Sequence, residues 1–482
     1  MALRIGVLAD DFTGATDIAG FLVSAGMTTV QFTSPEGLPE KFDERVDAAV
    51  ISMKTRSIAP GDAVAQSLQA LNALRARGAE QIIFKYCSTF DSTGEGNIGP
   101  VTDALLDAMG ETFTVLAPAL PVNGRTVYQG HLFVHDQPLD ESGMRDHPVT
   151  PMTDSSLVRL IQAQAQGSAV VIPYATVQAG PEAVRQALQD ARSSGARYAV
   201  PDTLDMRHLE TLGAALTEMP LITGGSGIGY GLARAVTQSR ESTATRAVTQ
   251  TRTVTQSRET GQDAGASRSA AADWTFTPGP AVVLSGSSSQ MTNAQVRDYR
   301  GRAAALPLEI SSVLEDAEGY CTEVVSWVRE QQSADTLAPL IYATASPEEV
   351  RTAQREHGAQ ELSAAIEEFF ARLARALREH GTRRFIVAGG ETSGAVTQGL
   401  GVRGFEVGPQ IAPGVPWTRT LPGEHPQATG EEPLDLALKS GNFGEEDFFT
   451  AAQQLVSQQR AAQQPASQEL PTQQPPTQEG RA

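Results

Sequence analysis

Short apolar runs alternate with segments of helical periodicity along most of the chain. The runs that predict buried strands are Leu3–Ala9, Ala48–Met53, Gln81–Lys85, Thr114–Ala117, Ala169–Pro173, Tyr198–Val200, Pro220–Thr223, Ala281–Leu284, Pro339–Ala343 and Phe385–Ala388. The segments that predict helices are Thr16–Ala25, Gly61–Arg77, Val101–Met109, Ser155–Ala165, Pro181–Ser193, Leu204–Leu216, Thr292–Ala304 and Pro347–His380. Because strands separated by helices are joined by right-handed crossovers, this order predicts an α/β fold of mainly parallel sheets flanked by helices.

Two stretches depart from this alternation. Residues 237–273 have Val248 and Val254 as their only branched aliphatic residues and carry repeated VTQ segments. The last thirty residues hold ten Gln and four Pro. Neither stretch can bury enough apolar surface to offset the entropy lost on ordering. We therefore expect two α/β lobes, residues 1–236 and 279–452, separated by a low-complexity linker at 237–278 and followed by a disordered tail at 453–482.

Charge and cysteine content narrow the range of partners. The net charge is −19, from 37 basic and 56 acidic residues, which disfavours binding to nucleic acid or anionic lipid. Cys87 and Cys321 form no CxxC pair, which argues against a zinc site or a disulfide framework. The sequence also lacks a membrane-length apolar run and the apolar core of a signal peptide. We expect a cytoplasmic protein without nucleic-acid or membrane partners, and leave a homodimer open.

Paired acids follow the first predicted strand, in the segment ADDFTGATD from Ala9. Ligands of parallel sheets collect at the carboxyl ends of strands, and the free amides of the next helix would face the same crevice. Asp10 and Asp11 could therefore bind Mg²⁺ or accept a proton. In the alternative, one acid only caps the helix, but that role needs a single acid.

A polar loop, KYCSTFDSTGEGNIGP, begins at Lys85. It contains a cation, several hydroxyls, Asp91, Asn97 and three glycines, more polar groups than a short turn requires. Such groups suit a polyol or an acid sugar as ligand. The alternative is a solvated loop, although long loops often carry function.

Three turns in the second half are rich in small residues. VVLSGSSSQMTNAQ from Val282 and FIVAGGETSGAVTQG from Phe385 each run from a buried strand into a helix, and LALKSGNFGEEDF from Leu436 places Lys439 and Gly441 in a similar setting. Small residues let a phosphate approach main-chain N–H groups, and a helix N-terminus favours its negative charge. Tight turns use the same residues, so the clustering carries more weight than any one turn.

Dinucleotide binding is the alternative from a different class, as in an NAD(P)-dependent dehydrogenase of four-carbon sugar acids. GLGVRG at Gly399 matches G-x-G-x-x-G, but it follows a predicted helix, whereas the dinucleotide fingerprint follows a strand. The sequence also lacks a P-loop motif. A non-catalytic metabolite-binding protein is a third reading, disfavoured by the paired acids beside phosphate-type turns.

The motifs taken together resemble the four-carbon acid sugar kinase family. The segments that carry the resemblance are ADDFTGATDIAG, KYCSTFDSTGEGNIGP, LAPALPVNGRTVYQGHLFV, ESGMRDHPVTPMTDSSLVRL, LSGSSSQMTNAQV, AGGETSGAV and ALKSGNFGEEDFF. The resemblance implies an N-terminal acid-sugar-binding lobe, a C-terminal ATP-binding lobe and an active site in the cleft between them. The KYCSTFDST form favours the branch that phosphorylates the 4-hydroxyl of 3-oxo-tetronate, with a threonate or erythronate kinase of the same family as the alternative.

The resemblance also assigns roles by motif. It implies ATP contacts at Ser285 or Ser287 and at Gly389, Gly390, Glu391, Thr392 and Gly441. It implies substrate contacts at Arg56, Lys85, Asp91, Ser92 and Thr93. We expect Asp10 or Asp11 to act as general base or metal ligand, ATP and Mg²⁺ as cofactors, and no separate metal site. Arg56 and Lys85 would hold the substrate carboxylate through charge-assisted bonds.

Overall fold

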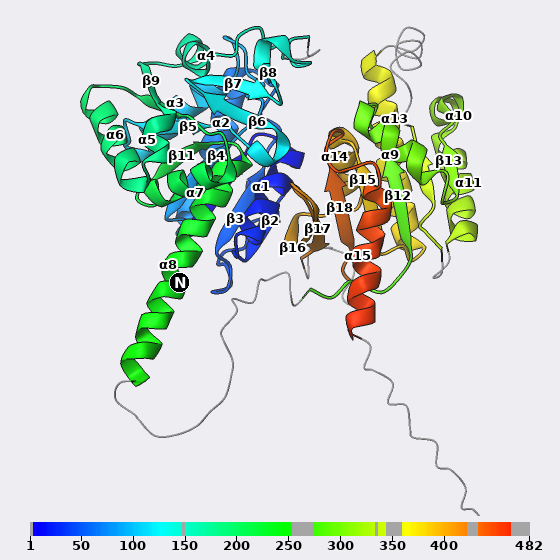
Figure 1. The fold of residues 1–482 in the computed structure, drawn as a ribbon. Helices are drawn as coiled ribbons and strands as arrows, with labels where there is room; N and C mark the ends of the chain where they lie inside the picture. Colours follow the sequence, from blue (N-terminus) through cyan, green and yellow to red (C-terminus); the bar gives the residue numbers. More distant parts are fainter. Residues whose placement is uncertain are drawn as a thin grey trace, which may run out of the picture.

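Two α/β halves lie side by side in the computed structural model, and each consists of a sheet with helices packed against it (Figure 1). The structure describes residues 3–146, 150–252, 274–332, 336–343, 359–421 and 432–463. The predicted α/β fold with mainly parallel sheets is therefore confirmed for both halves.

The first half has eight parallel strands in the order β2-β3-β1-β4-β11-β5-β10-β9. Their bounds are β1 Ile5–Ala9, β2 Thr29–Phe32, β3 Ala48–Ser52, β4 Gln81–Lys85, β5 Thr114–Ala117, β9 Ala169–Ile172, β10 Tyr198–Pro201 and β11 Leu221–Gly224. The helices are α1 Phe12–Ser24, α2 Pro60–Ala76, α3 Ile98–Met109, α4 Leu157–Gln164, α5 Tyr174–Gln178, α6 Pro181–Ser193, α7 Met206–Ala215 and α8 Ser226–Arg252. A small antiparallel sheet contains β6 Arg125–Tyr128, β7 His131–Val134 and β8 Gln137–Pro138, and short 3₁₀ turns lie at Pro35–Gly37, Pro121–Asn123 and Leu139–Glu141.

The second half has five parallel strands in the order β13-β14-β12-β15-β18, followed by the antiparallel hairpin β17-β16. The strand bounds are β12 Ala281–Ser285, β13 Ala305–Pro307, β14 Leu340–Tyr342, β15 Arg384–Ala388, β16 Gly404–Ala412, β17 Val415–Thr420 and β18 Asp435–Lys439. The helices are α9 Gln290–Tyr299, α10 Ile310–Glu315, α11 Ala317–Gln331, α13 Ala359–Glu379, α14 Gly390–Gly399 and α15 Phe448–Gln463. The predicted helix Pro347–His380 lies within the described residues only from 359 onward.

The hairpin β16-β17 joins the two halves into one continuous sheet of fifteen strands. Its strand β16 pairs antiparallel with β2, with Gly404 opposite Phe32 (Figure 1). The Phe12 ring at the start of α1 meets Phe405 edge-on at 6.4 Å. The strand–helix alternation of the sequence could not predict the pairing of β16 with β2, because the two strands lie more than 300 residues apart.

Two expected boundaries fall inside helices. Helix α8 continues through residue 236 to Arg252, and Arg240 forms an ion pair with Asp47 at 2.6 Å. Helix α15 extends past residue 453 to Gln463, because Val456 is buried and the Gln453 amide donates to the Tyr299 hydroxyl at 2.7 Å. Residues 253–273 and 464–482, which complete the two low-complexity stretches, lie outside the described residues.

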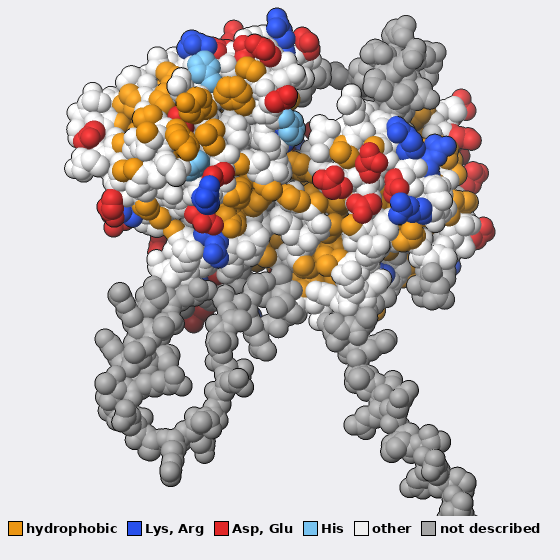
Figure 2. Space-filling view, in the orientation of Figure 1, with side chains coloured by type: hydrophobic (Ala, Val, Ile, Leu, Met, Phe, Trp, Pro, Cys, Tyr) orange, Lys and Arg blue, Asp and Glu red, His pale blue; other side chains and the backbone are white. Residues whose placement is uncertain are grey.

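Charged side chains of both signs are mixed over the face drawn in Figure 2, which agrees with the scattered basic residues of the sequence. Within the described residues, every helix is too short or too polar to cross a bilayer.

Candidate active site

Three neighbouring strands of the first half bring charged residues to one edge of the sheet. The ends of β3, β1 and β4 lie in register, with Ala9 opposite both Ser52 and Lys85. Asp10 follows β1 directly, and Arg56 lies in the loop that follows β3. The polar residues predicted from separate segments therefore meet in space, as expected for the carboxyl ends of parallel strands.

Arg56 holds the two predicted catalytic acids together. Its Nε and Nη2 donate to the two carboxylate oxygens of Asp10 at 2.9 and 2.8 Å, and Nη2 also donates to Asp11 at 2.6 Å. Its Nη1 lies 3.6 Å from Asp91. This fork-shaped pairing fixes the guanidinium firmly, since one planar group contacts two acids at once.

The two acids differ in environment although they are adjacent. Burial raises the pKa of Asp10 above its usual value, and the favourable charge of Arg56 offsets only part of that effect. Burial acts on the pKa of Asp11 too, but Arg56, Lys85 and hydrogen bonds outweigh it and leave that pKa lowered. Asp11 caps α1, because it accepts from the Gly14 amide at 3.0 Å and from the Thr13 hydroxyl at 2.8 Å. Asp11 therefore has the helix-capping role that the sequence analysis gave as the alternative to catalysis.

Lys85 points toward helix α1, where a third acid lies. Its ammonium is buried and stands 4.0 Å from Asp17, which also accepts a hydrogen bond from Ser226. Burial raises the pKa of Asp17 to about 6, against the opposing charge of Lys85. The sequence analysis did not single out Asp17, although an acid inside the apolar helix segment ATDIAGFLV was a usable signal.

The loop after β4 is held in an uncommon backbone conformation. Phe90 and Asp91 both have positive φ, at 67° and 39°, which non-glycine residues seldom adopt. Asp91 accepts from the Thr89 hydroxyl at 2.6 Å, and Ser92 donates to Gln164 at 3.1 Å. Strain of this kind clusters at binding sites, and here it turns Asp91 toward Arg56.

Thr93 and Asn97, two further residues of this loop, differ in burial. Thr93 is partly exposed, and its hydroxyl accepts from the Glu95 amide at 3.4 Å. Asn97 is buried and donates to the carbonyls of Thr55 and Ile58 at 2.7 and 2.9 Å. Asn97 therefore fixes the segment that carries Arg56, a role that sequence reasoning did not assign.

The three small-residue turns of the second half also meet. The ends of β12, β15 and β18 are in register, with Ala388 opposite both Ser285 and Lys439. A Cβ atom placed on Gly389 would lie 3.2 Å from the Ser287 amide, and one on Gly441 would lie 2.5 Å from the Ser287 hydroxyl. The turns that carry the predicted ATP-contact residues thus lie against one another, with glycines at their points of close approach.

The predicted ATP-contact residues differ in their exposure to solvent. Ser285 is fully buried at the end of β12, whereas Ser287 is partly exposed, so Ser287 is the better placed of the two serines. Gly389 has φ of 121° and precedes α14, whose first turn holds Gly390, Glu391 and Thr392. The first N–H groups of a helix have no intrahelical partner, so they are free to bind an anion.

The two sites face each other where the halves meet. A Cβ atom on Gly390, at the start of α14, would lie 3.8 Å from the Thr13 side chain at the start of α1. One on Gly394 would lie 3.8 Å from the Lys54 ammonium. The N-termini of helices from the two halves are therefore close neighbours, and the acids beside α1 lie near the predicted ATP turn.

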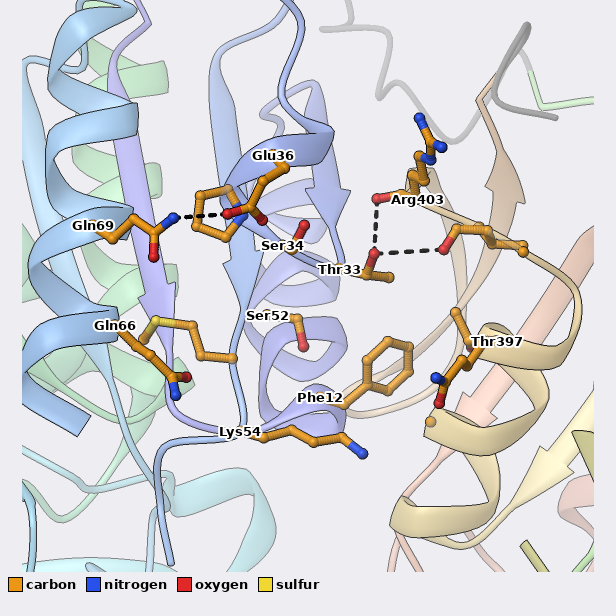
Figure 3. Close-up of a pocket in the computed structure, with 16 residues that line it drawn as sticks. Phe12, Thr33, Ser34, Glu36, Ser52, Lys54, Gln66, Gln69, Thr397 and Arg403 are labelled. Carbon is orange, nitrogen blue, oxygen red and sulfur yellow. Dashed lines mark hydrogen bonds between the residues drawn. The ribbon is translucent and has the colours of Figure 1, made fainter. Parts of the chain in front are cut away.

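A cavity of about 670 Å³ opens beside this junction. Figure 3 shows its walls, which come from the ends of β2 and β3, from α2, and from α14 and the loop after it. Phe12 and Lys54 lie on its floor, and Glu36 accepts from Gln69 at 2.7 Å on one wall. None of the residues predicted for catalysis or binding lines this cavity.

Among the described residues, no group of three or more His, Cys, Asp or Glu side chains is arranged to hold a metal ion. Asp10 and Asp11 provide only a pair of carboxylates. Mg²⁺ commonly binds through one or two carboxylates together with substrate phosphates. Of the two, Asp11 is better placed to bind Mg²⁺ or to accept a proton, because its Oδ2 accepts only the Thr13 hydroxyl whereas both oxygens of Asp10 are bound to Arg56.

A charged cluster in one half faces small-residue turns in the other, as expected of a two-domain enzyme that binds a small polar substrate next to a phosphate-bearing one. Family models agree with this division: residues 5–232 match a sugar-binding N-terminal domain and residues 282–449 match a nucleotide-binding C-terminal domain. The chain belongs to the four-carbon acid sugar kinase family.

Several relatives share about half of their residues with this chain. The 3-oxo-tetronate kinase of Brucella melitensis is 50% identical over 95% of this chain and 97% of its own, and that of Salmonella typhimurium is 51% identical over 94% and 99%. A solved structure from Salmonella typhimurium has a TM-score of 0.80 at 50% identity, covering 94% of this chain and 99% of its own. One from Haemophilus influenzae has a TM-score of 0.73 at 44% identity, covering 94% and 100%.

Proposed function

We propose that the protein transfers the γ-phosphoryl group of ATP to the 4-hydroxyl of 3-oxo-tetronate. This proposal rests mainly on one observation. The Asp10–Arg56–Asp11 cluster of the first half lies close to the start of α14 in the second half. Relatives named 3-oxo-tetronate kinase, at 50% and 51% identity over nearly the whole chain, support the choice of substrate. In this assignment residues 1–236 bind the acid sugar and residues 279–452 bind ATP.

The reaction needs positioning and countercharge more than covalent participation by the protein. The oxygen of the 4-hydroxyl attacks the γ-phosphorus, the bond from that phosphorus to the β–γ bridging oxygen breaks, and ADP leaves. The hydroxyl proton passes to a carboxylate. Asp11 is the better acceptor, because its side chain is 26% exposed whereas that of Asp10 is 7% exposed and clasped by Arg56.

The acid sugar would lie among the polar side chains of the first half. The Nη1 group of Arg56 has the loosest contact of its donors, 3.6 Å from Asp91, and is the one suited to a substrate carboxylate. Lys85 would contribute positive potential from beside α1 rather than direct contact, because its ammonium is buried next to Asp17. Ser92 and Thr93 would bound the sugar on the loop side.

The nucleotide phosphates would lie against Ser287, Gly441 and the first turn of α14. Main-chain N–H groups and the helix dipole stabilise negative charge there. Mg²⁺ bound to the phosphates would neutralise charge on the transferred group.

A coupled ADP-release assay with 3-oxo-tetronate, threonate and erythronate tests the proposal. We expect the highest kcat/KM with 3-oxo-tetronate and a requirement for a divalent cation. A higher value with threonate or erythronate would reassign the substrate within the family. Absence of ADP release with all three acids, together with NADH formation from NAD⁺, would replace the kinase by a dehydrogenase.

A further inference from the structure

Lys439 is a fully buried lysine at the end of β18 in the nucleotide-binding half. Its ammonium donates to the Thr292 hydroxyl at 3.1 Å and to the carbonyls of Ser440 and Gly441 at 2.9 and 3.0 Å. The Phe448 ring lies 5.9 Å away. In the part of the chain that the structure describes, no carboxylate comes within ion-pair distance of Lys439, and burial lowers its pKa to about 7. A buried cation without an acid is costly, so an apolar residue would serve better if packing were its only role.

Polar side chains donate hydrogen bonds to several main-chain carbonyls of the loop that Lys439 contacts. Thr292 donates to the Gly441 carbonyl at 2.7 Å. The amide of buried Gln295, one turn further along α9, donates to the carbonyls of Phe443 and Glu445 at 3.0 and 2.9 Å. Three polar side chains from β18 and α9 thus bind the carbonyls of Ser440, Gly441, Phe443 and Glu445.

Peptide geometry fixes where the amides of this loop point. The chain has no cis peptide among its described residues, and in a trans peptide the C=O of one residue and the N–H of the next point in opposite directions. With the carbonyls of Ser440 and Gly441 turned toward Lys439, the N–H groups of Gly441 and Asn442 point away from it. Within the described residues, neither N–H group has a hydrogen-bond acceptor.

We propose that Lys439, Thr292 and Gln295 form a carbonyl clamp that presents the amides of Gly441 and Asn442 to the nucleotide phosphates, with Lys439 as its positioning residue. The inference rests on the proposed function, because it needs ATP at this surface. Gly441 lies against Ser287, so its amide belongs to the same surface as the Gly389 turn. Lys439 acts through the loop and contributes the uncompensated positive charge behind it, which a phosphate chain would balance.

Calorimetric titration of ADP and of adenosine into Lys439→Met and Thr292→Val variants of the full chain tests the clamp. Thr292→Val keeps the side-chain shape but removes the hydroxyl that contacts both Lys439 and Gly441. Lys41→Met, at an exposed lysine of the other half, is the matched control. Adenosine lacks the phosphates that the loop amides would bind, so a general packing defect would weaken both ligands whereas loss of the clamp would weaken ADP alone.

We expect ADP affinity to fall about tenfold or more in Lys439→Met and by a smaller factor in Thr292→Val, with adenosine affinity unchanged in both. Unchanged ADP affinity in folded Lys439→Met, or equal losses for the two ligands, would overturn the clamp. If Lys439→Met does not fold, the same criteria applied to Thr292→Val decide. Failure of the unaltered protein to bind ADP would instead refute the proposed function, and the clamp with it.

Discussion

The site in the first half consists of charged side chains, whereas the site in the second half consists of main-chain turns. Asp10, Asp11, Asp91 and Arg56 lie within one network of ion pairs. The facing surface has glycines at its points of closest approach and one cation, Lys439, hidden behind it. A small carboxylated sugar can be selected by charges at fixed points, but a phosphate chain is better bound by many amides. Substitutions in the first region should therefore affect mainly turnover and binding of the acid sugar. Substitutions in the second region should affect mainly binding of ATP.

The largest effect is expected from the acids. Asp11→Asn should reduce kcat by on the order of 100-fold to 10,000-fold, because it removes the proton acceptor, while KM for ATP changes little. Asn still caps a helix but loses the ion pair with Arg56, so the thermal midpoint should fall only slightly. Steady-state kinetics and thermal unfolding of this variant and of Asp10→Asn check the assignment. Full turnover in both variants would remove the acids from the mechanism.

Arg56→Lys should have the next largest effect, on the acid sugar rather than on ATP. A lysine keeps the charge but cannot contact both oxygens of Asp10 and also reach Asp11 and the substrate. We expect KM for the acid to rise by about tenfold to 100-fold, with KM for ATP within a factor of about two. An unaltered KM for the acid would show that Arg56 serves only to hold the two aspartates.

Gly441→Ala tests the main-chain side of the comparison. Its methyl group would lie 2.5 Å from the Ser287 hydroxyl and 2.9 Å from the Ser289 hydroxyl, on the surface where phosphates should approach. We expect KM for ATP to rise about tenfold, with KM for the acid unchanged. Gly61→Ala is the control, because no atom lies within 4 Å of the added methyl group. Equal kinetics for the two variants would argue against phosphates at Gly441.

The smallest effect concerns Asp17 and pH. Its pKa is raised from 3.8 to about 6 in the folded protein, so the folded state holds more protons than the unfolded state between those values. Asp17 therefore costs stability as pH rises through that window, and the full cost is present above it. Asp17→Asn cannot titrate, so its thermal midpoint should gain a few degrees, roughly, relative to the parent between pH 4 and pH 7. A constant difference between the two midpoints would contradict the raised pKa.

Local signals in the sequence predicted much of this arrangement. The strand Gln81–Lys85 and the helix Pro181–Ser193 have the same bounds in the sequence prediction and in the structure, because periodicity and terminal residues define them locally. Helix α1 begins at Phe12 rather than Thr16, since Asp11 caps it. The rule that ligands collect at strand ends then predicted Asp10 and the turns that contain Gly389 and Gly441, whereas Arg56 was implied by the family resemblance.

Features that depend on distant partners were not predictable in this way. The pairing of β16 with β2 joins the two halves, and neither strand carries a local signal for that partner. The importance of Asn97 and Lys439 comes from the carbonyls they contact, and the sequence does not show which carbonyls those are. Side-chain chemistry was therefore easier to anticipate than the orientation of main-chain groups.

The most direct test of the account is a crystal structure with a non-hydrolysable ATP analogue and the acid sugar bound together. We predict that the β- and γ-phosphates contact main-chain amides at Gly389–Thr392, Ser287 and Gly441, and that the acceptor hydroxyl lies between Asp11 and the γ-phosphate. Phosphates bound elsewhere, with the Gly389–Thr392 turn empty, would contradict the central claim.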